Sequence, residues 1–330
     1  IHETMLKDTV RTDAYRDFIY QNKNLFAGKS VLDVGCGTAI LSMFCAKAGA
    51  THVYAVDNSS IIEKARENVY NNGLDDKITC LRGKIEEVIL PVKSVDIIIS
   101  EWMGYCLLYE AMLDSVIWAR DRYLKPGGLI VPSHMNMWVA PISDPDYIAD
   151  HILFWRDVYG FDMKAMQAGI YDEALILDMP FNTICGEPCP FYQLNLYSIN
   201  VKDVIFTKRW HSRISRDVDA LDGFMIWFDS FFTPNVDYTV SENSKAEDWI
   251  RDGKKGTAFT TGPNGKPTHW KQGVLFIDSN KEPPTPYKVG TEITADLSYD
   301  VPKENPRELT IIVNWRVREE AWKTQSWRVR

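Results

Sequence analysis

Residues 31–39 read Val31-Leu32-Asp33-Val34-Gly35-Cys36-Gly37-Thr38-Ala39. A short apolar run is followed by two glycines and the start of a helical pattern, which predicts a strand, a tight turn and a helix. Gly35 and Gly37 carry no Cβ, so the backbone of this turn can pass close to a ligand. Asp57 ends the next apolar run, where its carboxylate can accept hydrogen bonds from both hydroxyls of a ribose. This arrangement is shared by enzymes that bind NAD and enzymes that bind S-adenosylmethionine (SAM).

Two features favour SAM over NAD as the ligand of this turn. Asp33 lies two residues before Gly35, where a carboxylate would attract the ammonium group of SAM and repel a pyrophosphate. Position 40 is Ile, so the third glycine of the dinucleotide fingerprint is missing. SAM is therefore the predicted cofactor, and an NAD site or a turn without any ligand are the alternatives.

The first part of the chain alternates between strand and helix patterns. Apolar runs predict strands at 31–34, 53–56, 78–81 and 95–100, and helical patterns lie at 38–48, from Ser60 onward and at 113–124, where Pro126-Gly127-Gly128 predicts a stop. This alternation is typical of a parallel sheet covered by helices on both faces, the Rossmann-like α/β class. We expect a SAM-binding methyltransferase domain over residues 1–132.

The second part, residues 133–330, changes period. Residues 293–301 and 309–317 alternate apolar side chains with others, which predicts strands that bury one face. An antiparallel β-barrel-like domain is therefore expected here. Segment 146–169 mixes aromatic residues with helix formers, and the polar, charged segment 234–256 is predicted to be an exposed excursion.

Composition excludes several classes of protein. The 330 residues carry a formal net charge of −8, which disfavours nucleic acid as a partner and favours cationic partners such as arginine-rich peptides. No run approaches the roughly 20 apolar residues of a membrane helix, so no membrane partner is expected. Cys185 and Cys189 lack a second Cys/His pair nearby, so no metal site is predicted. The chain has neither an initiator Met nor a targeting signal, and we expect it to be part of a longer chain.

Residues 100–110 read Ser100-Glu101-Trp102-Met103-Gly104-Tyr105-Cys106-Leu107-Leu108-Tyr109-Glu110. They follow the fourth predicted strand, and ligands of open α/β sheets bind at the carboxyl ends of strands. Glu101 and Glu110 can converge if the loop between them folds as a hairpin. Two converging carboxylates suit a guanidinium, which presents planar, paired N–H donors.

This loop resembles the double-glutamate loop of the protein arginine N-methyltransferases, S-E-W-M-G-Y-x-L-x-x-E. Further motifs of the family occur in order: His2-Glu3-x-Met5-Leu6-x-Asp8-x-x-Arg11-Thr12, Val34-Gly35-Cys36-Gly37-Thr38, Lys84-Ile85-Glu86 and Thr268-His269-Trp270. The resemblance runs from His2 to at least Gln272. It is closest to the type I members, which make asymmetric dimethylarginine, and among them to the cytosolic branch associated with methylation of a small-subunit ribosomal protein.

The resemblance implies roles at the substrate. Glu101 and Glu110 would clamp the guanidinium, and His269 with Asp8 would form a proton relay. Met5 and Met103 would flank the target nitrogen and restrict the methylation pattern. Taken alone, Met5 fits a core position, Asp8 and Arg11 fit an ion pair on one helical face, and His269 beside Trp270 fits a structural role.

The resemblance also implies the cofactor contacts. Arg11 would pair with the SAM carboxylate, Gly35 and Gly37 would line its methionine and ribose parts, Asp57 would hold the ribose, and Ile85 and Glu86 would contact the adenine. Ala39 stands where the family has a third glycine, and alanine resists a positive φ. The aromatic-rich helix that closes over SAM in the family is not found before His2.

Partners and location follow from the resemblance as well. The arm at 146–169 resembles the helical arm through which family members form head-to-tail dimers, and its aromatics fit such an interface. We expect a homodimer that acts on arginine-containing proteins in the cytoplasm, with the nucleus as a second location. The alternatives are a methyltransferase for small molecules or nucleic acid, which the two carboxylates oppose, and a methyltransferase-like scaffold without activity.

Overall fold

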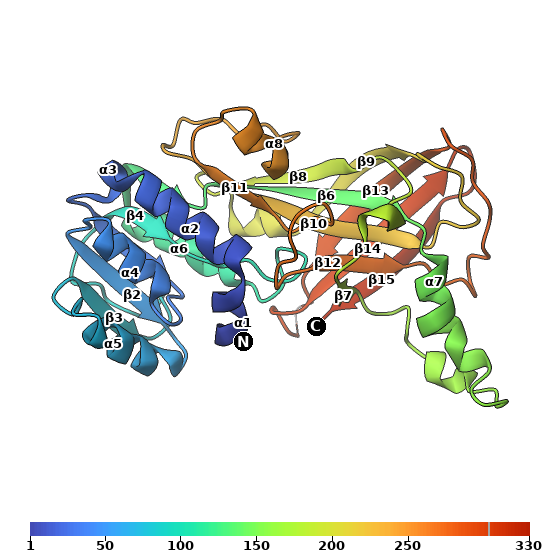
Figure 1. The fold of residues 1–330 in the computed structure, drawn as a ribbon, viewed down its shortest axis with the longest axis horizontal. Helices are drawn as coiled ribbons and strands as arrows, with labels where there is room; N and C mark the ends of the chain where they lie inside the picture. The colour runs from blue at the N-terminus through green and yellow to red at the C-terminus, as the bar shows by residue number, and fades with distance from the viewer. Residues whose placement is uncertain (303) are drawn as a thin grey trace.

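A computed structural model describes residues 1–302 and 304–330 (Figure 1). The first part contains a parallel sheet in the order β3-β2-β1-β4-β5. Its strands are β1 (Ser30–Val34), β2 (His52–Asp57), β3 (Ile78–Arg82), β4 (Val95–Ile99) and β5 (Leu124–Val131). The predicted Rossmann-like arrangement is confirmed. Because β1 lies at the centre, the residues that follow β1, β2 and β4 meet at one edge of the sheet.

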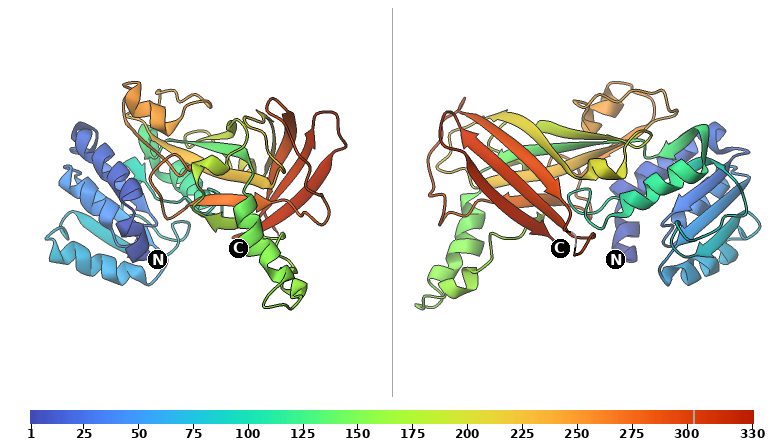
Figure 2. Two further views of the ribbon diagram at one scale, coloured as in Figure 1. Left: turned by 45° about the vertical axis from the view of Figure 1, so that its right-hand side comes forward. Right: turned by 180° about the vertical axis from the view of Figure 1, so that it is seen from behind.

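Helices lie on both faces of this sheet. They are α4 (Ile40–Lys47), α5 (Ile61–Asn71) and α6 (Met112–Tyr123). Figure 1 shows α4 in front of the sheet, and the view from behind in Figure 2 shows α6 on the opposite face. Three helices precede the sheet: α1 (His2–Lys7), α2 (Thr9–Gln21) and α3 (Lys23–Phe26).

The segment after α6 differs from the prediction. The helix already ends at Tyr123, and Pro126, Gly127 and Gly128 lie inside strand β5. The pairing of β5 with β4 shifts between Val95 and Ile97, and Gly127 has a φ of 72°. Proline has no N–H to donate and glycine tolerates a positive φ, so these residues form a bulge in the strand.

The second part contains two antiparallel sheets. The larger has six strands: β6 (His134–Ile142), β7 (Leu175–Leu177), β8 (Cys189–Asn195), β10 (Gly223–Phe232), β11 (Thr257–Thr260) and β12 (Gln272–Phe276). The smaller has four: β9 (Phe206–Arg213), β13 (Glu292–Asp300), β14 (Leu309–Val317) and β15 (Lys323–Val329). The predicted alternation in β13 and β14 is confirmed, because every second side chain there is buried.

The two antiparallel sheets pack face to face around an aromatic core. Phe224 of β10 packs edge-on against Trp210 of β9 and Trp315 of β14, with ring centroids 5.6 and 5.5 Å apart. In the described part of the chain, no strand of one sheet pairs along its length with a strand of the other, although isolated bridges link Gly186 to Ile214 and Glu173 to Arg328. The domain is therefore barrel-like without forming a closed barrel.

Two segments leave this body. The arm begins with α7 (Pro145–Tyr147), continues as a π-helical turn over Ile148–Ile152, and projects away from the parallel sheet (Figures 1 and 2). Segment 234–256, predicted to be an exposed excursion, contains α8 (Ala246–Arg251). That prediction is partly wrong, because Val240, Ala246 and Trp249 are buried against Phe231 of β10.

Within the described residues, no helix has the length and apolar character needed to span a bilayer.

The two parts of the protein share one core at their junction. Tyr15 and Phe18 of α2 pack against Phe232 of β10, with ring centroids 4.8 and 5.7 Å apart. Helix α2 therefore lies between the parallel sheet and the antiparallel sheets, and its N-terminal end reaches the edge where β1, β2 and β4 finish.

Candidate active site

A cavity of about 320 Å³ lies at this junction. Five segments line it: the α1–α2 region, the glycine loop after β1 with the start of α4, the end of β2 at Asp57, the loop after β4 up to Met112, and His269-Trp270. Nine of the predicted site residues line the cavity: Met5, Arg11, Gly35, Gly37, Asp57, Glu101, Met103, Glu110 and His269. The structure thus places residues predicted for the cofactor and residues predicted for the substrate around one space.

The glycine loop has the open geometry expected of a cofactor cradle. Gly35 and Gly37 have φ values of 71° and 53°, a conformation that favours glycine. A Cβ on Gly35 would overlap the side chain of Met112, which also lines the cavity. The N–H of Gly37 donates to Asp57 Oδ2 at 2.9 Å, which fixes the carboxylate at the cavity wall. Ala39 has a φ of 66°, so the alanine does adopt the conformation that the sequence marks as unfavourable for it.

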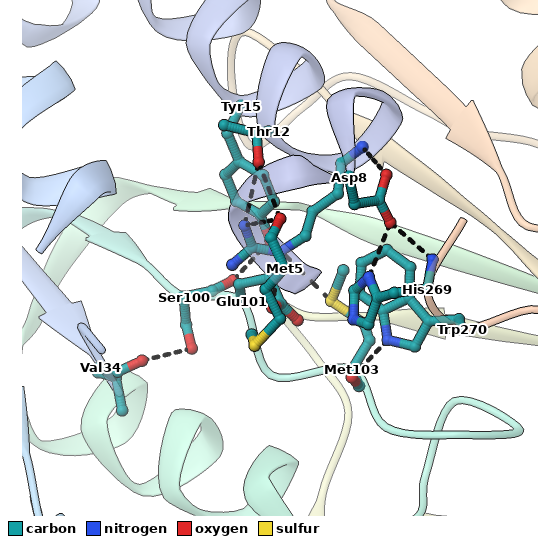
Figure 3. Close-up of polar contacts among 11 residues, drawn as sticks. Met5, Asp8, Thr12, Tyr15, Val34, Ser100, Glu101, Met103, His269 and Trp270 are labelled. Carbon is teal, nitrogen blue, oxygen red and sulfur yellow. Dashed lines mark hydrogen bonds and ion pairs between the residues drawn. The ribbon is translucent and has the colours of Figure 1, made fainter. Parts of the chain in front are cut away.

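Arg11 and Glu101 form a buried ion pair in the wall of the cavity. Arg11 Nε donates to Glu101 Oε2 at 2.8 Å. Arg11 Nη1 contacts Met5 O and Thr12 Oγ1 at 3.4 and 3.2 Å, whereas no hydrogen bond to Nη2 is found among the described residues. Figure 3 shows this cluster, in which the Tyr15 hydroxyl also donates to Ser100 O at 2.9 Å. The free Nη2 donor fits the carboxylate of SAM.

Asp33 does not line the cavity. It is fully buried behind the glycine loop, where Ser42 Oγ donates to its Oδ2 at 2.6 Å and Oδ1 has no partner among the described residues. Burial raises the pKa of the Asp33 carboxyl to about 7, although the Ser42 hydrogen bond acts in the opposite direction. An orphaned buried carboxylate oxygen fits an ammonium group better than a phosphate, and its contact with SAM stays a prediction.

Ile85 and Glu86 also lie outside the residues that line the cavity. Ile85 is buried in the core, and Glu86 is exposed and accepts a hydrogen bond from Ser115 Oγ at 2.6 Å. Met112, at the start of α6, does line the cavity. The predicted contact with adenine is therefore not part of this cavity.

Asp8 and His269 form a contact between the two parts of the protein. Asp8 Oδ2 accepts the backbone N–H of His269 at 2.8 Å and lies 2.7 Å from His269 Nδ1. Burial raises the pKa of Asp8, but hydrogen bonds from His269 and from the Arg11 backbone outweigh it, so the pKa is lowered overall. The alternative in which Asp8 and Arg11 form an ion pair on one helical face is wrong, because Arg11 pairs with Glu101 and Asp8 with His269. Asp8 breaks the helix and caps α2 by accepting from the N–H of Arg11.

The loop from Glu101 to Glu110 folds back on itself through a bridge between Gly104 and Leu107. Trp270 Nε1 donates to Met103 O at 2.7 Å. Glu110 lies at the exposed end of the loop, and its carboxylate is 3.5 Å from Arg307 Nη2. Arg307 is far from Glu110 in the sequence and belongs to none of the motifs, so its contact with Glu110 could not be predicted from the sequence.

Among the described residues, no group of three His, Cys, Asp or Glu side chains could hold a metal ion. All six cysteines are free thiols. The titratable side chains that line the cavity are the carboxylates of Asp57, Glu101 and Glu110, the guanidinium of Arg11, the imidazoles of His2 and His269, the phenols of Tyr105 and Tyr109 and the thiol of Cys36.

Comparisons with known proteins agree with this geometry. Residues 31–128 match the family model "Methyltransferase domain", and residues 133–320 match "Arginine methyltransferase oligomerization subdomain". The chain is 42% identical over 315 residues to protein arginine N-methyltransferase 1 of Schizosaccharomyces pombe. The aligned region covers 96% of this chain and 86% of that protein. This chain belongs to the protein arginine methyltransferase family.

Other members of the family show the same likeness. Ribosomal protein arginine N-methyltransferase rmt3 of S. pombe is 46% identical over 97% of this chain, which spans 56% of the length of that relative. The Trypanosoma brucei PRMT1 enzyme–prozyme heterotetrameric complex with AdoHcy contains a chain that superimposes with a TM-score of 0.88 at 34% identity, covering 100% of this chain and 98% of that one. Protein arginine methyltransferase 10 of Arabidopsis thaliana superimposes with a TM-score of 0.80 at 31% identity, covering 100% and 97%.

Proposed function

We propose that this chain transfers methyl groups from SAM to arginine side chains of proteins, giving monomethylarginine and then asymmetric dimethylarginine. The observation that supports it most is that Glu101 and Glu110 line the same cavity as the glycine loop and Asp57. A guanidinium and a methyl donor would therefore be held in one space between the two parts of the protein.

The two glutamates supply the chemistry that a guanidinium needs. Its pKa is above about 12, so the substrate arrives as a cation and its nitrogens are poor nucleophiles. Glu101 and Glu110 would hold the cation and concentrate its charge on one side, which leaves electron density on the nitrogen to be methylated. Arg11 occupies only Oε2 of Glu101, so Oε1 can accept a substrate N–H. Bound SAM supplies an electrophilic methyl group on a positively charged sulfur.

The methylated nitrogen must also lose a proton. We propose that His269, held by Asp8, accepts it directly or through a glutamate. The Asp8 carboxylate stays ionised because its pKa is lowered, so it can stabilise a protonated imidazole. Met5 and Met103 line the cavity beside Glu101, and their bulk would decide which nitrogen can be methylated a second time.

The proposal extends to assembly and substrate. Phe154, Tyr159 and Phe161 on the arm are 48%, 97% and 71% exposed, which supports an interface with a second copy of the chain. The name of the relative rmt3 supports a ribosomal protein, expected from the small subunit, as one substrate. A net charge of −8 supports cationic protein partners and opposes nucleic acid. The cytoplasmic location, the second location in the nucleus and the domain division at residue 132 stay predictions.

The decisive experiment incubates the chain with SAM and an arginine-rich peptide and follows methyl gain by mass spectrometry. We expect mono- and asymmetric dimethylarginine, and Glu101→Gln or Glu110→Gln should lower kcat/KM more than about 100-fold. Glu87→Gln is the matched control, because Glu87 is exposed and paired with Lys84 outside the cavity. SAM binding without methyl gain would indicate a scaffold, and methylation of another substrate class would overturn the assignment.

A further inference from the structure

The loop between the two glutamates has a backbone that its own residues do not favour. Cys106, Leu107, Glu110 and Ala111 have φ values of 51°, 72°, 82° and 57°. Each non-glycine residue in this left-handed region costs about 1 kcal/mol or more. Four such residues within six positions require contacts from outside the loop to hold the conformation.

Those contacts come from the second part of the protein, from strands β12 and β13 and from the loop between β13 and β14. The hydroxyl of Tyr299 on β13 donates to Cys106 O at 3.0 Å, and the N–H of Glu110 donates to Arg307 O at 3.1 Å. Cys106 Sγ also packs so closely on Gly273 of β12 that a Cβ there would overlap it. The turn of the loop is therefore anchored inside the second part of the protein.

Tyr299 is well placed to fix this turn. Its side chain is fully buried, and its ring stacks on Phe206 with centroids 4.9 Å apart. Packing thus fixes the ring and directs the hydroxyl at one carbonyl. Burial raises the pKa of Tyr299 well above its usual value, so the hydroxyl remains a neutral donor at any pH at which the enzyme works.

We propose that Tyr299 is a positioning residue for the methyl-transfer reaction: its hydrogen bond to Cys106 O holds the turn that sets the position of Glu110. Glu101 does not depend on this turn, because Arg11 holds its carboxylate from the other side of the cavity. The hydroxyl therefore affects the position of Glu110 and does not affect the residues predicted to bind SAM. This inference rests on the proposed role of Glu110 in binding the guanidinium.

The test is Tyr299→Phe in the full chain, which removes the hydroxyl and keeps the ring. We expect kcat/KM for an arginine-rich peptide to fall about tenfold, because Cys106 O loses its donor and the turn is free to move. Affinity for SAM, measured by calorimetry, should stay within about twofold. Tyr192→Phe is the matched control: its hydroxyl donates to Asp203 O at 2.8 Å and its ring also packs on Phe206, but it does not touch the loop. The control should behave as the wild type.

A double-mutant cycle separates positioning from general stability. If Tyr299 acts through Glu110, the Tyr299→Phe change should cost less than about twofold in the Glu110→Gln background. A tenfold loss in both backgrounds, an equal loss in Tyr192→Phe, or a wild-type rate for Tyr299→Phe would each overturn the proposal. A wild-type rate for Glu110→Gln alone would instead overturn the role of Glu110 in the clamp, whereas absence of methyl transfer by the wild type would overturn the proposed function.

Discussion

Arg11 Nε donates to Glu101 Oε2 at 2.8 Å, and the two side chains are only 6% and 4% exposed. The residue predicted to bind the cofactor carboxylate and the residue predicted to bind the substrate guanidinium are thus one ion pair. A ligand that binds Arg11 changes the electrostatic environment of Glu101, because little water screens charges at this depth. Cofactor binding and substrate binding are therefore expected to be coupled through this pair.

Breaking the pair from one side should destabilise the fold. Arg11→Ala leaves the carboxylate of Glu101 buried without its cation, and we expect the free energy of unfolding to fall by about 3 kcal/mol. Arg11→Ala combined with Glu101→Gln removes the uncompensated charge and should recover about half of that loss. Urea unfolding at pH 7 measures both changes. A double variant less stable than Arg11→Ala alone would contradict the ion pair as described.

Asp33 should make the ligand-free protein less stable as the pH rises. Its pKa is about 7 in the folded protein against an ordinary value of 3.8, because it is buried. Between pH 3.8 and 7 the unfolded chain releases this proton while the folded protein keeps it, so the free energy of unfolding falls with rising pH. Below pH 3.8 both states are protonated and the penalty is absent.

Asp33→Asn removes this penalty, which corresponds to about 4 kcal/mol above pH 7 if it were fully realised. We expect the variant to be more stable than the wild type by about 2 kcal/mol at pH 8, since the amide also lacks one partner. The difference should disappear near pH 4. If the difference in the free energy of unfolding between Asp33→Asn and the wild type were the same at pH 8 and at pH 4, the buried, uncompensated carboxyl would be refuted.

The sequence predicted most of the fold because apolar periodicity is a local signal. Strands β1 to β4 and β13 to β14 lie where that period places them, within one or two residues. The end of α6 was misjudged because a Pro-Gly pair such as Pro126-Gly127 occurs in strand bulges as well as after helix ends. Segment 234–256 was misjudged because three buried side chains in a polar segment do not produce a periodic pattern.

The candidate site was predictable only where a motif carries it. Glu101, Asp57 and the glycines stand at strand ends, and the topology brings strand ends together. The pairing of Arg11 with Glu101 and the support of Cys106 by Tyr299 depend on tertiary packing. Asp33 and Glu86 show the converse: a residue near a motif need not face the cavity.

Gly104 should tolerate no side chain. A Cβ at this position would overlap the carbonyl oxygen of Tyr109, which is backbone and cannot turn aside. Gly104→Ala must therefore shift the loop between the two glutamates, and we expect kcat/KM to fall more than about 100-fold while SAM still binds. Gly73→Ala is the control, because a Cβ there meets nothing within 4 Å and the positive φ of 62° costs only about 1 kcal/mol. Activity within tenfold of the wild type in Gly104→Ala would contradict this loop geometry.

The arm should carry the contact between two copies of the chain. Tyr159 and Phe161 are 97% and 71% exposed beyond the π-helical turn, and exposed aromatic side chains at the end of a projecting arm mark an interface. We expect the wild type to be dimeric and the combined variant Tyr159→Ser, Phe161→Ser to be monomeric, as measured by sedimentation velocity at micromolar concentration. Ile89→Ser is the matched control: Ile89 is 89% exposed but lies on the methyltransferase part, away from the arm. A monomeric wild type, or an unchanged dimer in the arm variant, would contradict the arm as the interface. Loss of the dimer in both variants would also contradict it, because the dimer would then not depend specifically on the arm.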